Sequence, residues 1–162
     1  TGTVVGLPVK VAAGALLMLA ANLHAQDIGS DWPEGSSMHT LHMESKRLDS
    51  AHAALSDAHA GLLARLERMG GGAPVLAGEV ALHHERWVAY RKADCELSGT
   101  LTGAGGAWPA VHGLTCERTQ VENRARAVDT VRRCLEGLPP DHARFEQLEC
   151  LEGLVDGFDH GY

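Results

Sequence analysis

Histidine is the residue type whose number in this chain most strongly suggests chemistry, because neutral imidazole is the commonest metal ligand. Ten histidines occur in 162 residues. His52 and His59 lie seven residues apart, which on a helix separates them by about 10.5 Å, too far to share one ion. His39 and His42, three residues apart, form a closer pair that Glu44 or the adjacent His83 and His84 could complete. No H-E-x-x-H motif or cysteine–histidine cluster is present, so we expect histidines on helix faces, with no metal site and no cofactor.

Catalytic patterns are also missing from the sequence. It contains no G-x-S-x-G nucleophile elbow and no G-x-x-x-x-G-K-[ST] phosphate loop. The acidic residues Glu79, Glu85 and Asp94 are spread along one predicted helix, where carboxylates usually face solvent or pair with arginines. We therefore expect no catalytic residues and predict that the protein is not an enzyme.

Four cysteines form an even set without a C-x-x-C pair: Cys95, Cys116, Cys134 and Cys150. The spacing gives no support to a zinc ribbon or a thioredoxin-type redox site. In an oxidising compartment such cysteines form disulfides, whereas in the cytosol they stay reduced. Their interpretation therefore depends on whether the chain is exported.

The N-terminal segment resembles an export signal. Lys10 is the only charged residue in 1–25, and an almost unbroken apolar run, Val11 to Leu23, follows it. A cation, an apolar run of this length and a small residue, here Ala25, are typical of a secretory signal peptide. We expect cleavage before Gln26 and a periplasmic or other extracytoplasmic location. An uncleaved membrane anchor is the alternative, although a membrane span needs about 20 apolar residues.

Composition and charge restrict the class of the remaining chain. Residues 26–37 contain glycine, proline and serine and are predicted to be a linker into a single domain, 38–162. Only 4% of residues are aromatic, which favours helices packed through small side chains. The net charge of −7 disfavours nucleic acid and anionic membranes as partners. Contact with a membrane is therefore expected only through 1–25, if that segment is retained.

Hydrophobic periodicity predicts about four helices. Leucines recur every seven residues from Leu41 to Leu62 and are followed by Met69, which indicates a long helix ended by Gly70–Gly72. A second helix is predicted for about 76–97, with one face formed by Val80, Trp87, Tyr90 and Leu97. A glycine-rich loop, 98–109, follows.

Pro109 suits the first turn of a third helix that runs to Gly137. After Pro139–Pro140, Asp141 is expected to cap a last helix whose buried face holds Phe145, Leu148, Leu151 and Val155. Antiparallel packing of these helices would pair Cys95 with Cys116 and Cys134 with Cys150, because each pair brackets a helix-breaking loop. The predicted fold is an all-α antiparallel hairpin or bundle with two disulfides, preceded by a signal-like apolar helix.

The central segment resembles the N-terminal domain family of LprI-like lysozyme inhibitors. The resemblance depends on a pattern W-x-x-Y-R-x-x-x-C, a glycine-rich loop and C-x7-R, which here are Trp87, Tyr90, Arg91, Cys95, Cys116 and Arg124. It covers roughly 44–135 and implies an exported helical hairpin with a Cys95–Cys116 disulfide. Some members of the family inhibit lysozyme, and most have no assigned activity. Residues beyond 135 would form a C-terminal helical extension.

Spacing suggests structural roles for the motif residues. Trp87, Tyr90, Arg91 and Cys95 are three or four residues apart and share one helical face. We expect the aromatic side chains to pack on the third helix. Arg91 or Arg124 could donate to carbonyls at a helix end or pair with a carboxylate.

The glycine-rich loop is the candidate partner-binding segment. The stretch 100–109 has no charge, contains Gly105, Gly106 and the potential anchor Trp108, and is joined at its base by the predicted disulfide. A constrained, uncharged loop could enter a lysozyme cleft, although the same residues could be a simple connector. The alternatives are a scaffold or subunit of a membrane-associated envelope complex and, third, a histidine-rich periplasmic metal binder.

Overall fold

The computed structural model describes residues 31–70, 72–139 and 144–155, and this part of the chain is all-helical, as predicted. Its elements are α1 (Ser37–Glu67), α2 (Ala73–Leu101), α3 (Trp108–Glu136), α4 (Arg144–Leu151) and the 3-10 helix η2 (Glu152–Leu154). The predicted signal segment, the first part of the linker and the expected Asp141 cap lie outside the described residues.

Local sequence signals explain where α1 begins and ends. The Ser36 hydroxyl oxygen accepts a hydrogen bond from the His39 amide at 3.2 Å, which satisfies one of the free donors at the helix start. The predicted leucine stripe is buried at Leu48, Leu55 and Leu62. The helix ends at Glu67, just before the predicted glycine break, and Gly72 has a positive φ of 86°.

The hairpin of α2 and α3 is tighter than predicted. The second helix was expected to span about 76–97, but it runs from Ala73 to Leu101, so the connecting loop is 102–107 rather than 98–109. Gly103 and Gly106 have positive φ angles of 63° and 62° and form the turn. Gly99 lies inside α2. Because it has no side chain, α3 can approach α2 closely at this point. Pro109 lies in the first turn of α3, as predicted.

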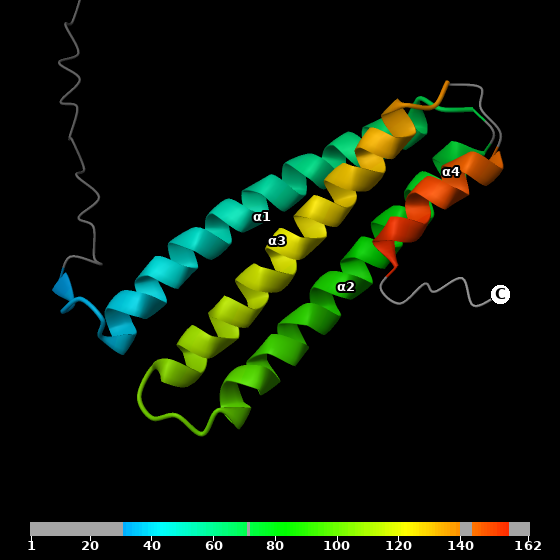
Figure 1. Ribbon diagram of the computed structural model, residues 1–162. Helices are drawn as coiled ribbons and strands as arrows, with labels where there is room; N and C mark the ends of the chain where they lie inside the picture. The colour runs from blue at the N-terminus through cyan, green and yellow to red at the C-terminus, as the bar shows by residue number, and fades with distance from the viewer. Residues whose placement is uncertain (1–30, 71, 140–143, 156–162) are drawn as a thin grey trace, which may run out of the picture.

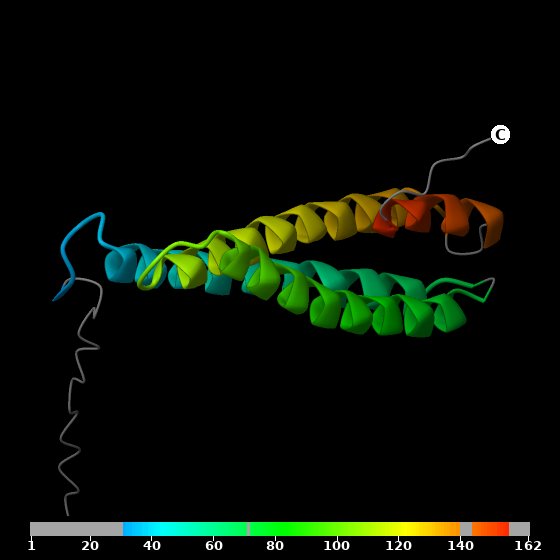
Figure 2. The same ribbon diagram turned by 90° about the horizontal axis from the view of Figure 1, so that it is seen from below.

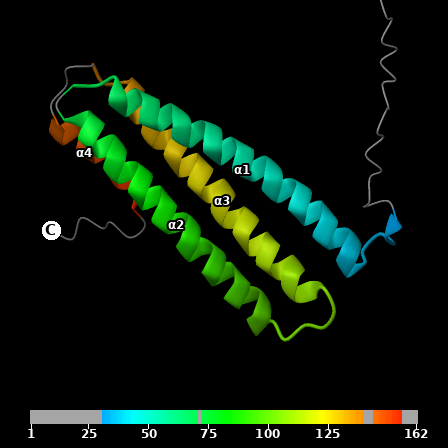
Figure 3. The same ribbon diagram turned by 180° about the vertical axis from the view of Figure 1, so that it is seen from behind.

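Helix α3 is the central element of the bundle. Figures 1 and 3 show it between α1 and α2, beginning at the glycine-rich loop and running to the opposite end of the bundle. Figure 2 shows that α4 lies on the same side as the C-terminal half of α3, opposite the first half of α2. Helices α1 and α2 contact each other less than either contacts α3.

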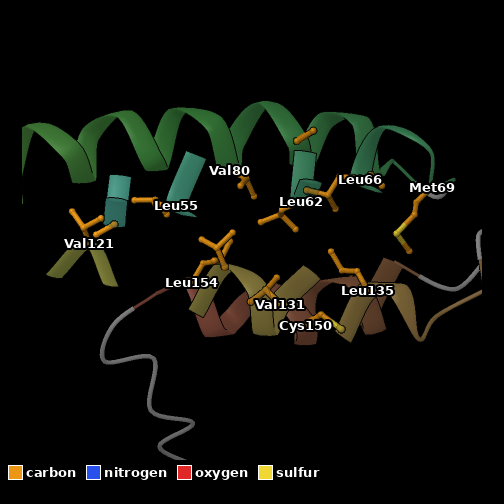
Figure 4. Packing of buried hydrophobic residues seen from close by; sticks show 14 of the residues in the cluster. Leu55, Leu62, Leu66, Met69, Val80, Val121, Val131, Leu135, Cys150 and Leu154 are labelled. Atoms are coloured by element: carbon orange, nitrogen blue, oxygen red, sulfur yellow. The ribbon is translucent and has the colours of Figure 1, made fainter. Parts of the chain in front are cut away.

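The hydrophobic core fills the end of the bundle that carries α4. In Figure 4, aliphatic side chains from α1 and α2 face those of α3, α4 and η2. The fully buried members include Leu62, Leu66, Val121, Val128 and Leu135. Arg65 of α1 closes this end, because its guanidinium donates to the carbonyl oxygens of Leu135 and Leu138, at 2.8 and 2.7 Å from Nη2. These bonds satisfy the Leu138 carbonyl, which lies beyond the end of α3, and add to the bond that the Leu135 carbonyl accepts from the Leu138 amide at 3.3 Å.

Both predicted disulfides are confirmed. Cys95–Cys116 joins α2 to α3 with a Cα–Cα distance of 5.5 Å, and Cys134–Cys150 joins α3 to α4 at 5.7 Å. In the chain-entropy model, closing loops of this length stabilises the folded state by about 3 kcal/mol each.

The predicted face of the last helix is wrong. Phe145, Leu148 and Val155 are exposed, whereas the buried residues are Gln147, Cys150 and Leu154. The cause is covalent, since the bond from Cys150 to Cys134 turns that face of α4 towards α3. The amide nitrogen of the Gln147 side chain then donates to the Gly70 carbonyl at 3.3 Å, which ties α4 to the turn between α1 and α2.

Gly99→Ala tests the close approach of α2 and α3. A Cβ at Gly99 would lie 2.3 Å from the Pro109 carbonyl oxygen, so the helices would have to separate. We expect this change to lower the free energy of unfolding by about 2 kcal/mol, despite the better helix propensity of alanine. Urea unfolding followed by circular dichroism measures it.

Gly105→Ala is the matched control, because no atom lies within 4 Å of the Cβ position at Gly105. Its unfolding free energy should stay within about 0.5 kcal/mol of the wild type. If Gly99→Ala is equally harmless, the two helices do not touch at this point.

Candidate functional site

Two buried arginines approach Trp87 from neighbouring helices. The guanidinium carbon of Arg91 on α2 lies 5.1 Å from the centre of the Trp87 ring, and that of Arg124 on α3 lies 5.4 Å from it. A cation near the face of an indole is attracted by the ring electrons, by about 0.5–2 kcal/mol. Trp87 therefore packs against α3, as predicted, although its contacts are with cations as well as apolar groups.

Each arginine also has a polar partner, and the two partners differ in kind. Arg91 Nη2 lies 2.7 Å from Glu117 Oε1 on α3, in an ion pair. Arg124 donates to the Leu154 carbonyl at the end of η2, and its Nη2 lies 2.8 Å from His83 Nδ1 on α2. Both arrangements considered from the sequence, a carboxylate and a helix-end carbonyl, thus occur. Burial lowers the pKa of Arg91, and Glu117 opposes that shift.

A buried carboxylate, Glu44, ties α1 to α3. Its oxygens lie 2.8 Å from Arg118 Nε on α3 and 2.7 Å from Arg47 Nη1 on α1. The hydrogen bond from Arg118 lowers the pKa of Glu44 most, with a further contribution from Arg47 against the effect of burial. Glu44, one of the two candidates to complete a metal site with His39 and His42, is thus engaged by arginines.

Histidines form a stack between α1 and α2. The rings of His59 and His84 lie 4.0 Å apart between centroids, and His84 also stacks on Trp87 at 5.8 Å. Burial is the main cause that lowers the pKa of His84 to about 4, followed by the nearby charges of His59 and Arg124. Burial likewise lowers the pKa of His59. Both rings are neutral at pH 7.

Within the described ranges, one group of potential metal ligands, Asp94, Cys95 and Cys116, has its ligand atoms within 4.8 Å of one another. The two cysteines are bonded to each other and offer no thiolate. Asp94 accepts a hydrogen bond from Gln120 Nε2 at 3.0 Å. This cluster is therefore a disulfide with polar neighbours.

An apolar groove lies at the loop end of the bundle, where α1 and α2 flank α3. It has a volume of about 830 Å³ and is open to solvent. Its lining residues come from the segment before α1 and from all three long helices: Trp32, Met38, Leu41, His42, Ser45, Lys92, Cys95, Glu96, Thr100, Pro109, Ala110, Gly113, Leu114 and Glu117. The volume lies within the range of binding sites for small molecules or side-chain anchors.

The floor and one wall of the groove are rigid. The Cys95–Cys116 disulfide joins α2 to α3 beside it. Gly99 and Gly113 lie at the crossing, where added Cβ atoms would meet backbone atoms of the opposite helix at 2.3 and 3.3 Å. Small residues and a covalent bond thus hold this part of the hairpin in one arrangement.

The glycine-rich loop projects beyond the groove. No atom lies within 4 Å of a Cβ built at Gly103, Gly105 or Gly106. The Thr102 hydroxyl donates to the Gly99 carbonyl at 2.7 Å and accepts from the Ala104 amide at 3.3 Å, so the loop is braced from inside. Trp108 was expected in the loop, but it is the first residue of α3, about 39% exposed, with its ring 6.4 Å from that of His112.

The predicted buried face of α2 is wrong in part. Tyr90 and Leu97 are 66% and 57% exposed, and Tyr90 does not join Trp87, Arg91 and Cys95 in packing on α3. Side chains on the outward face of α2 form an exposed apolar stripe, named here the α2 outer stripe: Val75, Leu82, Tyr90, Leu97 and Leu101. Helix α2 thus carries apolar residues on two faces, and periodicity alone did not show which one is buried.

Sequence reasoning missed Trp32 and Met38, which were assigned to the linker and the domain boundary. Both are exposed and line the groove. The position of Trp32, a few residues before the Ser36 cap, could have indicated that this segment packs on the domain, because a large aromatic side chain in a linker is unusual.

Comparison of this chain with models of protein families, with curated proteins and with solved structures finds no match.

Trp87→Ala tests the arginine–tryptophan contacts. Loss of the ring removes apolar contacts and leaves Arg91 and Arg124 without their shared aromatic partner. We expect the free energy of unfolding to fall by about 3 kcal/mol. Trp87→Phe, which keeps an aromatic face, should cost less than half as much. Equal losses for both variants would contradict the claim that an aromatic face at this position stabilises the packing of the two arginines.

Proposed function

We propose that this chain is an exported, non-catalytic protein of the bacterial envelope that binds a protein partner through the loop end of its hairpin. The observation that carries the proposal is the combination at one end of the molecule of an open apolar groove and a braced, uncharged, projecting loop. Apolar pockets flanked by exposed aromatic residues are typical of surfaces that bind other proteins.

The covalent structure supports export. Two disulfides are compatible with an extracytoplasmic location, because reducing compartments seldom retain such bonds. In the described ranges, no helix has the length and apolar character needed to cross a membrane. We place the protein in the periplasm or a similar compartment, reached through a cleaved signal in 1–25.

A lysozyme is the partner that this geometry and the family resemblance favour. Lysozymes act through two carboxylates in an open cleft, so an inhibitor needs a narrow segment that brings no negative charge into the cleft. Residues 98–109 contain no charged side chain, and Gly105 and Gly106 make the tip narrow. We propose that this tip enters the cleft while Trp108 and the groove contact its rim.

Pre-organisation would make such binding favourable. A flexible glycine loop loses conformational entropy when it is ordered in a complex, which weakens affinity. Here the hydrogen bonds of Thr102 brace the start of the loop, and the Cys95–Cys116 disulfide joins the two helices that carry it, before any partner binds. Most of the conformational entropy of the loop would then be lost on folding rather than on binding.

Inhibition of lysozyme by the mature protein is the direct test. The wild type should slow peptidoglycan hydrolysis by a lysozyme in a dose-dependent way. Gly105→Glu should weaken inhibition at least tenfold, because it places a carboxylate opposite the catalytic pair, and Trp108→Ala should weaken it similarly by removing an anchor. Circular dichroism should show unchanged helicity for both.

Leu97→Glu is the matched control, because it adds the same charge on the α2 outer stripe, at a residue that does not line the groove. It should inhibit like the wild type. If folded wild-type protein inhibits no class of lysozyme, the lysozyme proposal is wrong. If Gly105→Glu and Trp108→Ala both inhibit as well as the wild type, the lysozyme-binding site is not at the loop end.

A second candidate function, a subunit of a membrane-associated envelope complex, is favoured by the α2 outer stripe. Five large apolar side chains on one outward helix face exceed the scattered exposed residues of an ordinary surface. Such a stripe fits a partner helix with its own apolar face. This candidate uses a different surface from the proposed inhibitor, so the two can be separated.

Photo-crosslinking in the intact envelope distinguishes the two candidates. A photoreactive amino acid is placed at Leu97 in one variant and at Gly105 in another. A complex subunit should give a discrete adduct from Leu97 only, and an inhibitor should give one with lysozyme from Gly105 only. A lysozyme adduct from Leu97 would contradict the proposed assignment of surfaces.

A further inference from the structure

The stacked imidazoles of His59 and His84 link α1 to α2, the two long helices that contact each other least. Helices α1 and α2 contact each other less than they contact α3, and this stack is a direct aromatic link between them. Beside it is a small hollow of about 310 Å³, whose lining includes Leu55, Leu63 and Val88. Separation of the two rings would enlarge this hollow and expose those side chains.

The two rings lie in surroundings that oppose positive charge. His59 Nε2 and His84 Nδ1 are buried and have no hydrogen-bond partner. Burial lowers the pKa of His84 most, and the charged and titratable groups that lower it further are His59 from α1, Arg124 from α3, and Arg91 and His83 from α2. The nearby carboxylate of Glu117 pairs with Arg91 and lies 3.8 Å from His52 Nε2.

We propose that the His59–His84 stack is an acid-sensitive latch that holds α1 against α2 while both rings are neutral and releases them when either ring is protonated. A proton on one ring would place a third positive charge next to Arg91 and Arg124, and among the described residues no carboxylate is one of the groups that shift the pKa of either ring. The stack itself would lose its neutral contact of 4.0 Å. The latch concerns the middle of the bundle and does not depend on the partner proposed for the loop end.

The direction of the pH effect follows from the lowered pKa values. A histidine whose folded-state pKa is below its unfolded value binds protons preferentially when unfolded, so stability is full above the unfolded value and falls with acid. For His84 this window runs from 6.5 down to about 4. Measurements between pH 7 and pH 4.5 sample most of it and largely avoid titration of Glu44, whose pKa is lowered from 4.5.

Amide hydrogen exchange and thermal unfolding of the full protein test the latch. Exchange rates are corrected for the intrinsic effect of pH. From pH 7 to pH 4.5, the amides of 52–63 and 80–91 in the wild type should lose protection against hydrogen exchange. The melting temperature should fall about 4 °C further than in His59→Gln/His84→Gln. His112→Gln, a change on the exposed side of α3, should behave like the wild type. Parallel losses in the wild type and the double variant would overturn the proposal.

A titration of the wild type alone keeps the test valid if the double variant does not fold. Imidazole resonances followed by NMR should show midpoints for His59 and His84 below that of the exposed His112. Loss of protection in 52–63 and 80–91 should coincide with the lower midpoints. Midpoints equal to that of His112, or protection that persists through them, would show that the stack is no latch.

Discussion

The contact of Trp87 with Arg91 and Arg124 is the interaction on which the arrangement of the helices depends. Arg91 binds Glu117 and so links α2 to α3, while Arg124 reaches His83 of α2 and the Leu154 carbonyl of η2. A buried guanidinium is costly unless its donors are used, so these partners restrict how the helices can pack. Three elements, α2, α3 and η2, thus meet around one indole ring, in a chain with few aromatic residues.

This junction separates two ends with different properties. On one side, aliphatic residues of α1, α2, α3 and η2 form a closed core with Cys150 of α4, completed by the Cys134–Cys150 bond. On the other side, α4 is absent and α3 lies between α1 and α2, which leaves an apolar groove open. An exposed apolar groove lowers the stability of the free protein. The fold tolerates this loss because the arginine junction and the closed core stabilise the rest of the bundle.

Much of the fold could be predicted from sequence, because heptad spacing, glycine breaks and cysteine placement are local signals. The incorrect predictions of buried faces share one cause, because tertiary contacts rather than local sequence decide which helix face is buried. Large apolar residues such as Tyr90 and Leu97 were expected to be buried, but the interface of α2 with α3 near the loop uses Arg91, Cys95 and Gly99, since small or paired residues allow close approach. The groove could not be predicted, because its walls come from segments more than sixty residues apart, such as Leu41 and Leu114. The glycine tip could be predicted, because it depends on composition alone.

A double-mutant cycle between Arg91 and Glu117 tests most directly whether the arginine junction organises the bundle. The free energy of unfolding is measured for the wild type, Arg91→Met, Glu117→Gln and the double variant. Glu117→Gln should be strongly destabilising, by about 3 kcal/mol, because it leaves a buried charge without its partner. The double variant should be more stable than the sum of the single losses predicts, by at least about 1.5 kcal/mol. Additive losses, within about 0.5 kcal/mol, would contradict the claim that this ion pair holds α2 to α3.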